Sequence, residues 1–158
     1  MKTKIRPLPL AVCIAIPLAA GGISALLTRD AMAEFEAVTK PPLAPPGWLF
    51  PAVWTVLFIL MGIASYIVLT SGEEPREINR ALWLYGIQLA FNFMWSIIFF
   101  NMKLYLFAFM WLIALLALII VTAWRFCRIK KAAGYLLLPY IIWVMFAGYL
   151  NLGICLLN

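Results

Sequence analysis

Residues 104–124 read LYLFAFMWLIALLALIIVTAW, and this stretch contains no charged side chain. An α-helix of about 20 apolar residues crosses about 30 Å of hydrocarbon, so the stretch is long enough to span a bilayer. On either side of it, four further charge-free segments of similar length cover residues 8–27, 48–69, 81–102 and 134–157. The sequence therefore predicts an all-α membrane protein whose single domain, residues 1–158, is a bundle of five transmembrane helices.

The composition excludes a water-soluble domain. Apolar residues make up 66% of the chain and charged residues 11%, against about 45–50% and about 25% in soluble domains. The net charge of +6 does not indicate nucleic-acid binding, because the basic side chains are confined to connectors between the apolar segments. Histidine, the commonest metal ligand, is missing, and Cys13, Cys127 and Cys155 share no metal-binding spacing. We therefore expect no metal site and no obligatory cofactor.

The first apolar segment has two interpretations. Lys2, Lys4 and Arg6 precede it and residues 31–33 read Ala-Met-Ala, as in a signal peptide with its cleavage site. However, the apolar run is longer than the 7–15 residues or so of a signal peptide, and four further spans follow. We expect a true transmembrane helix that bends at Pro17.

The basic residues predict the orientation of the five spans. Nine of them fall on the side of the N-terminus, namely Lys2, Lys4, Arg6, Arg76, Arg80, Arg125, Arg128, Lys130 and Lys131. Three fall on the other side, namely Arg29, Lys40 and Lys103. Because cytoplasmic connectors carry the excess of Lys and Arg, this split predicts a multi-pass protein of the cell membrane with a cytoplasmic N-terminus and an external C-terminus.

Polar side chains in the third span lie on one helix face. Gln88 and Asn92 are four residues apart and Trp95 continues the same face, while Gly86 and Ala90 fall on the opposite face. Polar groups in a span are expected to point into the bundle, so Gln88 and Asn92 could contact a ligand. A hydrogen bond between helices, without any ligand, explains the two amides equally well. The two small residues allow close approach of another helix or of a second copy.

Two other spans carry aromatic faces of the same kind. In the second span, one face carries residues spaced three or four apart, namely Trp54, Phe58, Met61 and Ser65. In the fifth span the same spacing links Tyr140, Trp143, Ala147 and Asn151. Such stripes normally pack helices together. Three spans nevertheless each supply a Trp plus a small or polar residue, which together suit an apolar slot for a planar aromatic ligand. No span holds a charged residue, which disfavours an ion-coupled transporter.

Three blocks of sequence carry a recognisable pattern: KPPLAPPGWLFPAVWTVLF at residues 40–58, QLAFNFMWS at residues 88–96, and Pro139-Tyr140, Trp143, Phe146-Ala147 and Leu150-Asn151 in the fifth span. In these blocks the chain resembles the TspO/MBR family, the tryptophan-rich sensory proteins related to the mitochondrial translocator protein (peripheral benzodiazepine receptor). The resemblance implies a five-helix bundle, usually dimeric, whose pocket opens toward a lid loop at residues 28–47. Members bind porphyrins and, in the same pocket, isoquinoline carboxamide and benzodiazepine drugs. Some bacterial members promote light-dependent porphyrin breakdown, and animal members bind cholesterol.

The resemblance also assigns residues. Trp54 and Trp143 match the pocket tryptophans associated with ligand contact and with porphyrin breakdown, and are thus the candidate catalytic residues. Asn92 and Trp95 match pocket residues of the third helix, and Ala147 matches a small residue whose bulk affects binding. Two departures stand out: Glu34-Phe35 replaces the usual Trp-Tyr, and no basic residue follows Tyr149, so cholesterol recognition is not expected.

These observations predict a membrane receptor or sensor for tetrapyrroles, present as a homodimer. The macrocycle would stack on Trp54, Trp95 and Trp143, with Gln88 and Asn92 offering hydrogen bonds and Lys40 meeting a propionate. The full set of expected ligand-binding residues is Lys40, Trp54, Phe58, Gln88, Asn92, Trp95, Tyr140, Trp143 and Ala147. Two alternatives remain open, namely light-dependent degradation of protoporphyrin IX and passive translocation of small amphipathic molecules.

Overall fold

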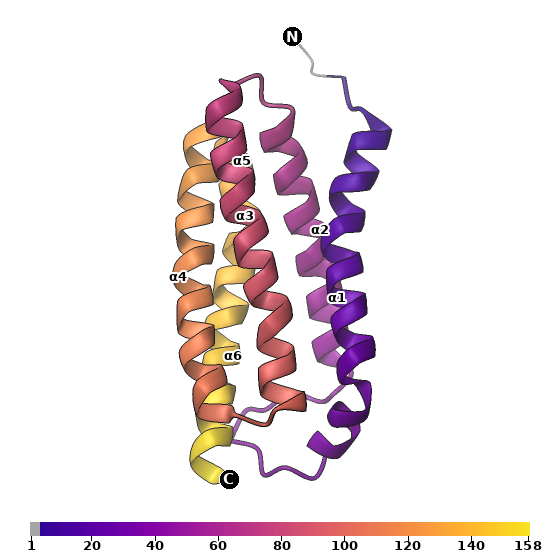
Figure 1. Cartoon of the computed structure of the whole chain (residues 1–158), viewed down its shortest axis with the longest axis vertical. Coiled ribbons are helices and arrows are strands. Elements are labelled where there is room, and N and C mark those ends of the chain that lie inside the picture. Colours follow the sequence, from indigo (N-terminus) through magenta and orange to yellow (C-terminus); the bar gives the residue numbers. More distant parts are fainter. Residues whose placement is uncertain (1–3) are drawn as a thin grey trace.

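A computed structural model describes residues 4–158 as a helical bundle (Figure 1). Its elements are α1 (Pro7–Phe35), α2 (Leu49–Leu69), α3 (Pro75–Ser96), the π-helix η1 (Ile97–Asn101), α4 (Tyr105–Ile129), α5 (Lys131–Tyr135) and α6 (Leu138–Leu157). Five helical segments are long and apolar enough to cross a membrane, and α3 with η1, and α5 with α6, each form one of them. The predicted all-α bundle of five spans is confirmed.

The helices run alternately up and down, so the two ends of the bundle differ (Figure 1). The start of α1 and the connectors after α2 and α4 lie at one end, here called the basic end, and the C-terminus and the connector after α1 lie at the other. Closely packed pairs are α1 with α2, α3 with α4, and α4 with α6. Lys2, one of the basic residues that predict orientation, lies outside the described residues.

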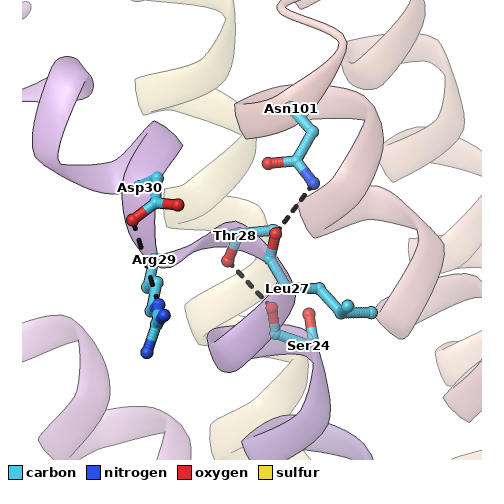
Figure 2. A network of polar contacts seen from close by, with 6 residues as sticks. All are labelled: Ser24, Leu27, Thr28, Arg29, Asp30 and Asn101. Atoms are coloured by element: carbon cyan, nitrogen blue, oxygen red, sulfur yellow. Dashed lines mark hydrogen bonds and ion pairs between the residues drawn. The ribbon is translucent and has the colours of Figure 1, made fainter.

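The first helix is longer than predicted and continues to Phe35, past residues 31–33. The sequence prediction ended this span at the first charged residues, but the Ala-rich stretch that follows favours helix beyond the bilayer. Figure 2 shows how this turn is held: Thr28 Oγ1 donates to the Ser24 carbonyl at 2.9 Å, and Asn101 Nδ2 donates to the Leu27 carbonyl at 3.0 Å. The lid loop therefore covers residues 36–48 rather than 28–47.

The fifth span is interrupted. A turn at residues 136–137 separates α5 from α6, where the sequence prediction had one continuous segment at 134–157. Pro139 accounts for the break, because its ring excludes the helical carbonyl four residues earlier and it has no N–H to donate. In contrast, Pro17 lies buried inside α1, and the helix continues through it.

Gly62 sets the distance between α1 and α2. A Cβ atom added there would lie 2.5 Å from Ile14 Cα and 2.7 Å from the Cys13 carbonyl oxygen. The two backbones thus approach each other more closely than any side chain at this position would allow. The hydrophobic effect does not drive helix association inside a bilayer. Close packing of the two backbones at small residues drives it instead.

Candidate ligand-binding site

A chain of hydrogen bonds joins α3 to α6 in the bundle interior. Asn92 Nδ2 donates to the Tyr140 hydroxyl at 2.7 Å, and the same hydroxyl donates to Gln88 Oε1 at 2.8 Å. All three side chains are buried, with Gln88 and Tyr140 each only 1% exposed. The alternative of a hydrogen bond between helices is therefore realised for both amides. This bond does not account for the whole side chain of Gln88, because its Nε2 is buried and has no partner in the described part of the chain.

Aromatic rings connect α2 to α6 in what we call the aromatic bridge, formed by Phe50, Trp54, Tyr140 and Trp143. The Trp54 ring meets the Tyr140 ring edge-on at 6.1 Å between centroids, and the Phe50 ring meets that of Trp143 in the same way at 5.8 Å. Phe58 stacks on Trp54 at 5.6 Å. Since the backbones of α2 and α6 are not a closely packed pair, these two helices meet mainly through ring contacts.

Three buried polar atoms of the bundle interior lack hydrogen-bond partners within the described residues. Trp143 Nε1, Gln88 Nε2 and the Tyr85 hydroxyl have no hydrogen-bond partner among residues 4–158. A buried donor left unpaired costs about 1–3 kcal/mol, so native structures usually supply a partner, which is a protein group, a water or a ligand. Trp143 and Gln88 were expected at the site from the sequence.

Phe50 and Tyr85 were missed by the sequence analysis. Each has a signal in the chain, because Phe50 lies four residues before Trp54 and Tyr85 three residues before Gln88, on the same helix faces. Ala147 also lies on the inward face of α6, one turn after Trp143, and is buried.

Trp95 lies in a different cluster from the aromatic bridge. Its Nε1 donates to Asn151 Oδ1 at 3.2 Å, and Asn151 Nδ2 donates to the Tyr105 carbonyl at 2.9 Å. Its ring stacks on Phe99 at 5.3 Å, and no ring contact joins it to Trp54 or Trp143 within the described chain. The structure thus gives Trp95 a role in tying α3 to α6 and α4.

The lid loop is docked on α6. Pro41 is buried, and a Cβ atom added to Gly153 would lie 2.6 Å from Pro41 Cβ. The Tyr149 hydroxyl donates to the Pro42 carbonyl at 2.7 Å, and Asn158 Nδ2 donates to the Thr39 carbonyl at 2.9 Å. The loop therefore closes the end of the bundle toward which a pocket between α2 and α6 would open.

Lys40 is held by the end of α1. Its Nζ donates to the carbonyls of Phe35, Glu36 and Val38 at 3.3, 3.2 and 3.3 Å, and lies 4.9 Å from the centroid of the Phe35 ring. The last carbonyls of a helix have no partners within the helix, and a lysine satisfies them well. Lys40 would have to leave these carbonyls before it could meet a ligand propionate.

An ion pair fastens the last turn of α1 to the connector before α4. Lys103 Nζ lies 2.6 Å from Glu34 Oε2. The hydrogen bond that Lys103 donates to Glu34 and the charge of the Glu34 carboxylate raise the pKa of Lys103 above its ordinary value. Both side chains are exposed to solvent, so the contribution of this pair is small and sensitive to salt.

The outer face of α3 is separate from these contacts. Gly86 and Ala90 are exposed there, opposite Gln88 and Asn92, as their spacing predicts. They line a shallow groove of about 530 Å³ together with Trp83. The homodimer that the two small residues favour remains a prediction.

The fold and the site together define a class, a multi-pass helical membrane protein with an aromatic, partly polar interior beneath a docked loop. Comparison with known proteins supplies the family. The chain matches the TspO/MBR family over residues 13–157 and belongs to that family. The resemblance seen in the sequence is thereby confirmed.

Three relatives illustrate the breadth of the match. The chain is 42% identical to the tryptophan-rich protein TspO of Chlorobaculum tepidum over 96% of both chains. It is 38% identical to the tryptophan-rich protein TspO of Archaeoglobus fulgidus, over 96% of this chain and 97% of the relative. It is 32% identical to the translocator protein of Bos taurus, over 86% of this chain and 82% of the relative.

Proposed function

We propose that the chain is a membrane receptor or sensor that binds tetrapyrroles between α2 and α6, under the lid loop. The observation that carries this proposal is a pair of buried donors without partners among residues 4–158, namely Trp143 Nε1 in the aromatic bridge and Gln88 Nε2, whose side chain bonds to Tyr140 of the bridge. A porphyrin offers a planar aromatic face to the rings and anionic propionates to donors at its edge. Aromatic rings prefer to contact one another by offset stacking or edge to face.

Ligand binding between α2 and α6 requires the ring contacts between these helices to separate. A flat ligand entering between α2 and α6 must part the Trp54–Tyr140 and Phe50–Trp143 contacts, each of which is a contact between two side chains rather than between backbones. Edge-to-face ring pairs contribute about 0.5–1.5 kcal/mol each, and stacking on the ligand replaces them. The same slot would take isoquinoline carboxamide and benzodiazepine ligands, which are also flat and mostly apolar.

The proposal includes an orientation and a location. The basic end would face the cytoplasm, because most of the Lys and Arg residues lie there, and the lid loop and C-terminus would face outward. In the cell membrane this orientation admits ligands from the external side. Reactivity of a single cysteine placed in the lid loop toward an impermeant reagent, in intact cells, tests the orientation.

Quenching of tryptophan fluorescence by protoporphyrin IX, in detergent and in darkness, tests the binding. Wild type should show saturable quenching. Trp143→Phe keeps a ring but loses the unpartnered N–H, so its Kd should rise about fivefold, the equivalent of about 1 kcal/mol for one hydrogen bond. Trp124→Phe, which changes an exposed ring on α4, is the matched control and should bind as wild type does.

Three other results would change the proposed function. If quenching does not saturate in wild type, porphyrin binding in the bundle is wrong. Repeating the titration under illumination tests the degradation alternative: loss of porphyrin absorbance that requires light and an intact Trp143 would make the protein an enzyme. Equal Kd values for wild type and Trp143→Phe would move the ligand away from the aromatic bridge.

A further inference from the structure

A groove of about 870 Å³ lies on the outer surface at the basic end of the bundle, between α3 and α4. None of its residues belongs to the aromatic bridge or contacts the lid loop. Its lining is polar at the end of the bundle and apolar farther along α3. The residues that matter are Arg76, Arg80 and Arg125 at the polar part, and Trp83, Leu84 and Ile87 along the apolar part.

The polar part carries an excess of positive charge. Glu77 lies between two of the arginines, with Oε1 3.4 Å from Arg80 Nη1 and Oε2 3.7 Å from Arg125 Nη1. This single carboxylate holds the guanidinium groups of two helices close together while neutralising only part of their charge. Arg76 makes no ion pair with residues 4–158. Guanidinium groups in such a cluster suit phosphate oxygens, which they can bind through two parallel hydrogen bonds.

The apolar part has the length of one bilayer leaflet. From Arg76 to Ile87 the helix rises about 16 Å, close to half of the roughly 30 Å hydrocarbon core. Trp83 is 76% exposed and Ile87 is 46% exposed, on a face that would meet lipid in a spanning helix. A ligand matching the whole groove has an anionic group at one end and a long apolar chain at the other.

We propose that this groove binds one anionic phospholipid from the leaflet at the basic end. Its phosphate would lie among Arg76, Arg80 and Arg125, and an acyl chain would follow Leu84 and Ile87. A free phosphate ion would leave the apolar part without a partner. A second copy of the chain packed symmetrically here would place its own arginines near these, and like charges across an interface are unfavourable.

Lipid retention tests the proposal. The purified full chain is reconstituted in nanodiscs with equal amounts of phosphatidylglycerol and phosphatidylcholine, transferred to detergent, and analysed by native mass spectrometry for retained lipids. Wild type should retain phosphatidylglycerol preferentially. Arg76→Gln with Arg80→Gln should lower this preference about 25-fold, because each basic residue near an anionic lipid contributes about fivefold. Arg76→Gln alone, which breaks no ion pair, should lower it about fivefold.

A matched control separates the groove from general charge attraction. Lys130→Gln with Lys131→Gln removes the same charge at the same end of the bundle, but neither residue lines the groove. This variant should keep the preference within about twofold of wild type. In parallel, thermal unfolding of delipidated protein should shift upward with phosphatidylglycerol and not with inorganic phosphate. Circular dichroism should show equal helicity in all variants.

Three outcomes would overturn the proposal. Equal loss of preference in the arginine and lysine variants would show only diffuse attraction to anionic lipid. An equal thermal shift with inorganic phosphate would make the site a plain anion site. A change from dimer to monomer in Arg76→Gln/Arg80→Gln, with an unchanged lipid ratio, would assign the groove to contact between two copies.

Discussion

Substituting Gly153 by Ala tests whether the lid loop depends on close contact with α6. The added methyl carbon would lie 2.6 Å from Pro41 Cβ and 2.7 Å from Pro41 Cγ, well inside van der Waals distance. Neither partner can adjust by rotating a side chain, because the proline ring is fused to the loop backbone and Gly153 is part of a helix. The loop must therefore move away from α6.

The size of the effect follows from two opposing contributions. Overpacking by one methyl group typically costs about 1–3 kcal/mol. Replacing Gly by Ala inside a helix also stabilises the helix by up to about 1 kcal/mol, whether the loop is docked or not. Only the overpacking changes the balance between docked and undocked loop. The undocked population should rise about 5- to 150-fold, the range that corresponds to about 1–3 kcal/mol.

Amide hydrogen exchange of residues 36–48 measures this population. In Gly153→Ala, exchange of the protected loop amides should be faster by the same factor, and the association rate of protoporphyrin IX should increase if the loop limits access. Gly22→Ala is the control, because a Cβ there meets nothing within 4 Å. Loop exchange in Gly153→Ala equal to that in Gly22→Ala would refute the account of how the loop docks.

Three further predictions concern the scaffold. Tyr140→Phe removes the hydroxyl that joins two buried amides and should lower the free energy of unfolding by about 1–3 kcal/mol in denaturant titration, whereas Tyr135→Phe, at an exposed ring, should not. Gly62→Ala forces α1 away from α2 and should lower thermal stability by an overpacking cost of about 1–3 kcal/mol. Glu34 raises the pKa of Lys103, so their ion pair stabilises the fold fully below the ordinary lysine pKa of about 10.4. This stabilisation is lost as the pH rises through the raised pKa of Lys103. The difference in unfolding free energy between wild type and Lys103→Met should therefore shrink above the raised pKa.

Helical spacing made much of the interior predictable. Gln88 and Asn92 are four residues apart, which fixes them on one face whatever the neighbours are, and the structure places both inside the bundle. Spacing alone does not identify the hydrogen-bond partner that another helix supplies. The sequence therefore offered ligand contact and a hydrogen bond between helices as equal alternatives for these amides, and only the fold brings the Tyr140 hydroxyl between them.

The differences between prediction and structure have separate physical causes. The end of α1 was misplaced because charged residues mark the edge of the bilayer and not the end of the helix, which continues to Phe35. Lys40 was treated as free to meet an anion, whereas the unpaired carbonyls at that same helix end hold it. Both depend on where α1 stops, which no glycine directly after the helix marks in the sequence.

The contacts of the lid loop also determine when the site can form during synthesis. Thr39 bonds to Asn158, a residue 119 positions later in the chain, and Pro41 packs on Gly153. The loop leaves the ribosome well before α6, which carries the surface that receives it. Until the final helix is inserted, the loop has no docking surface and half of the aromatic bridge is missing. Assembly of the candidate site must therefore wait until α6 has been synthesised and inserted.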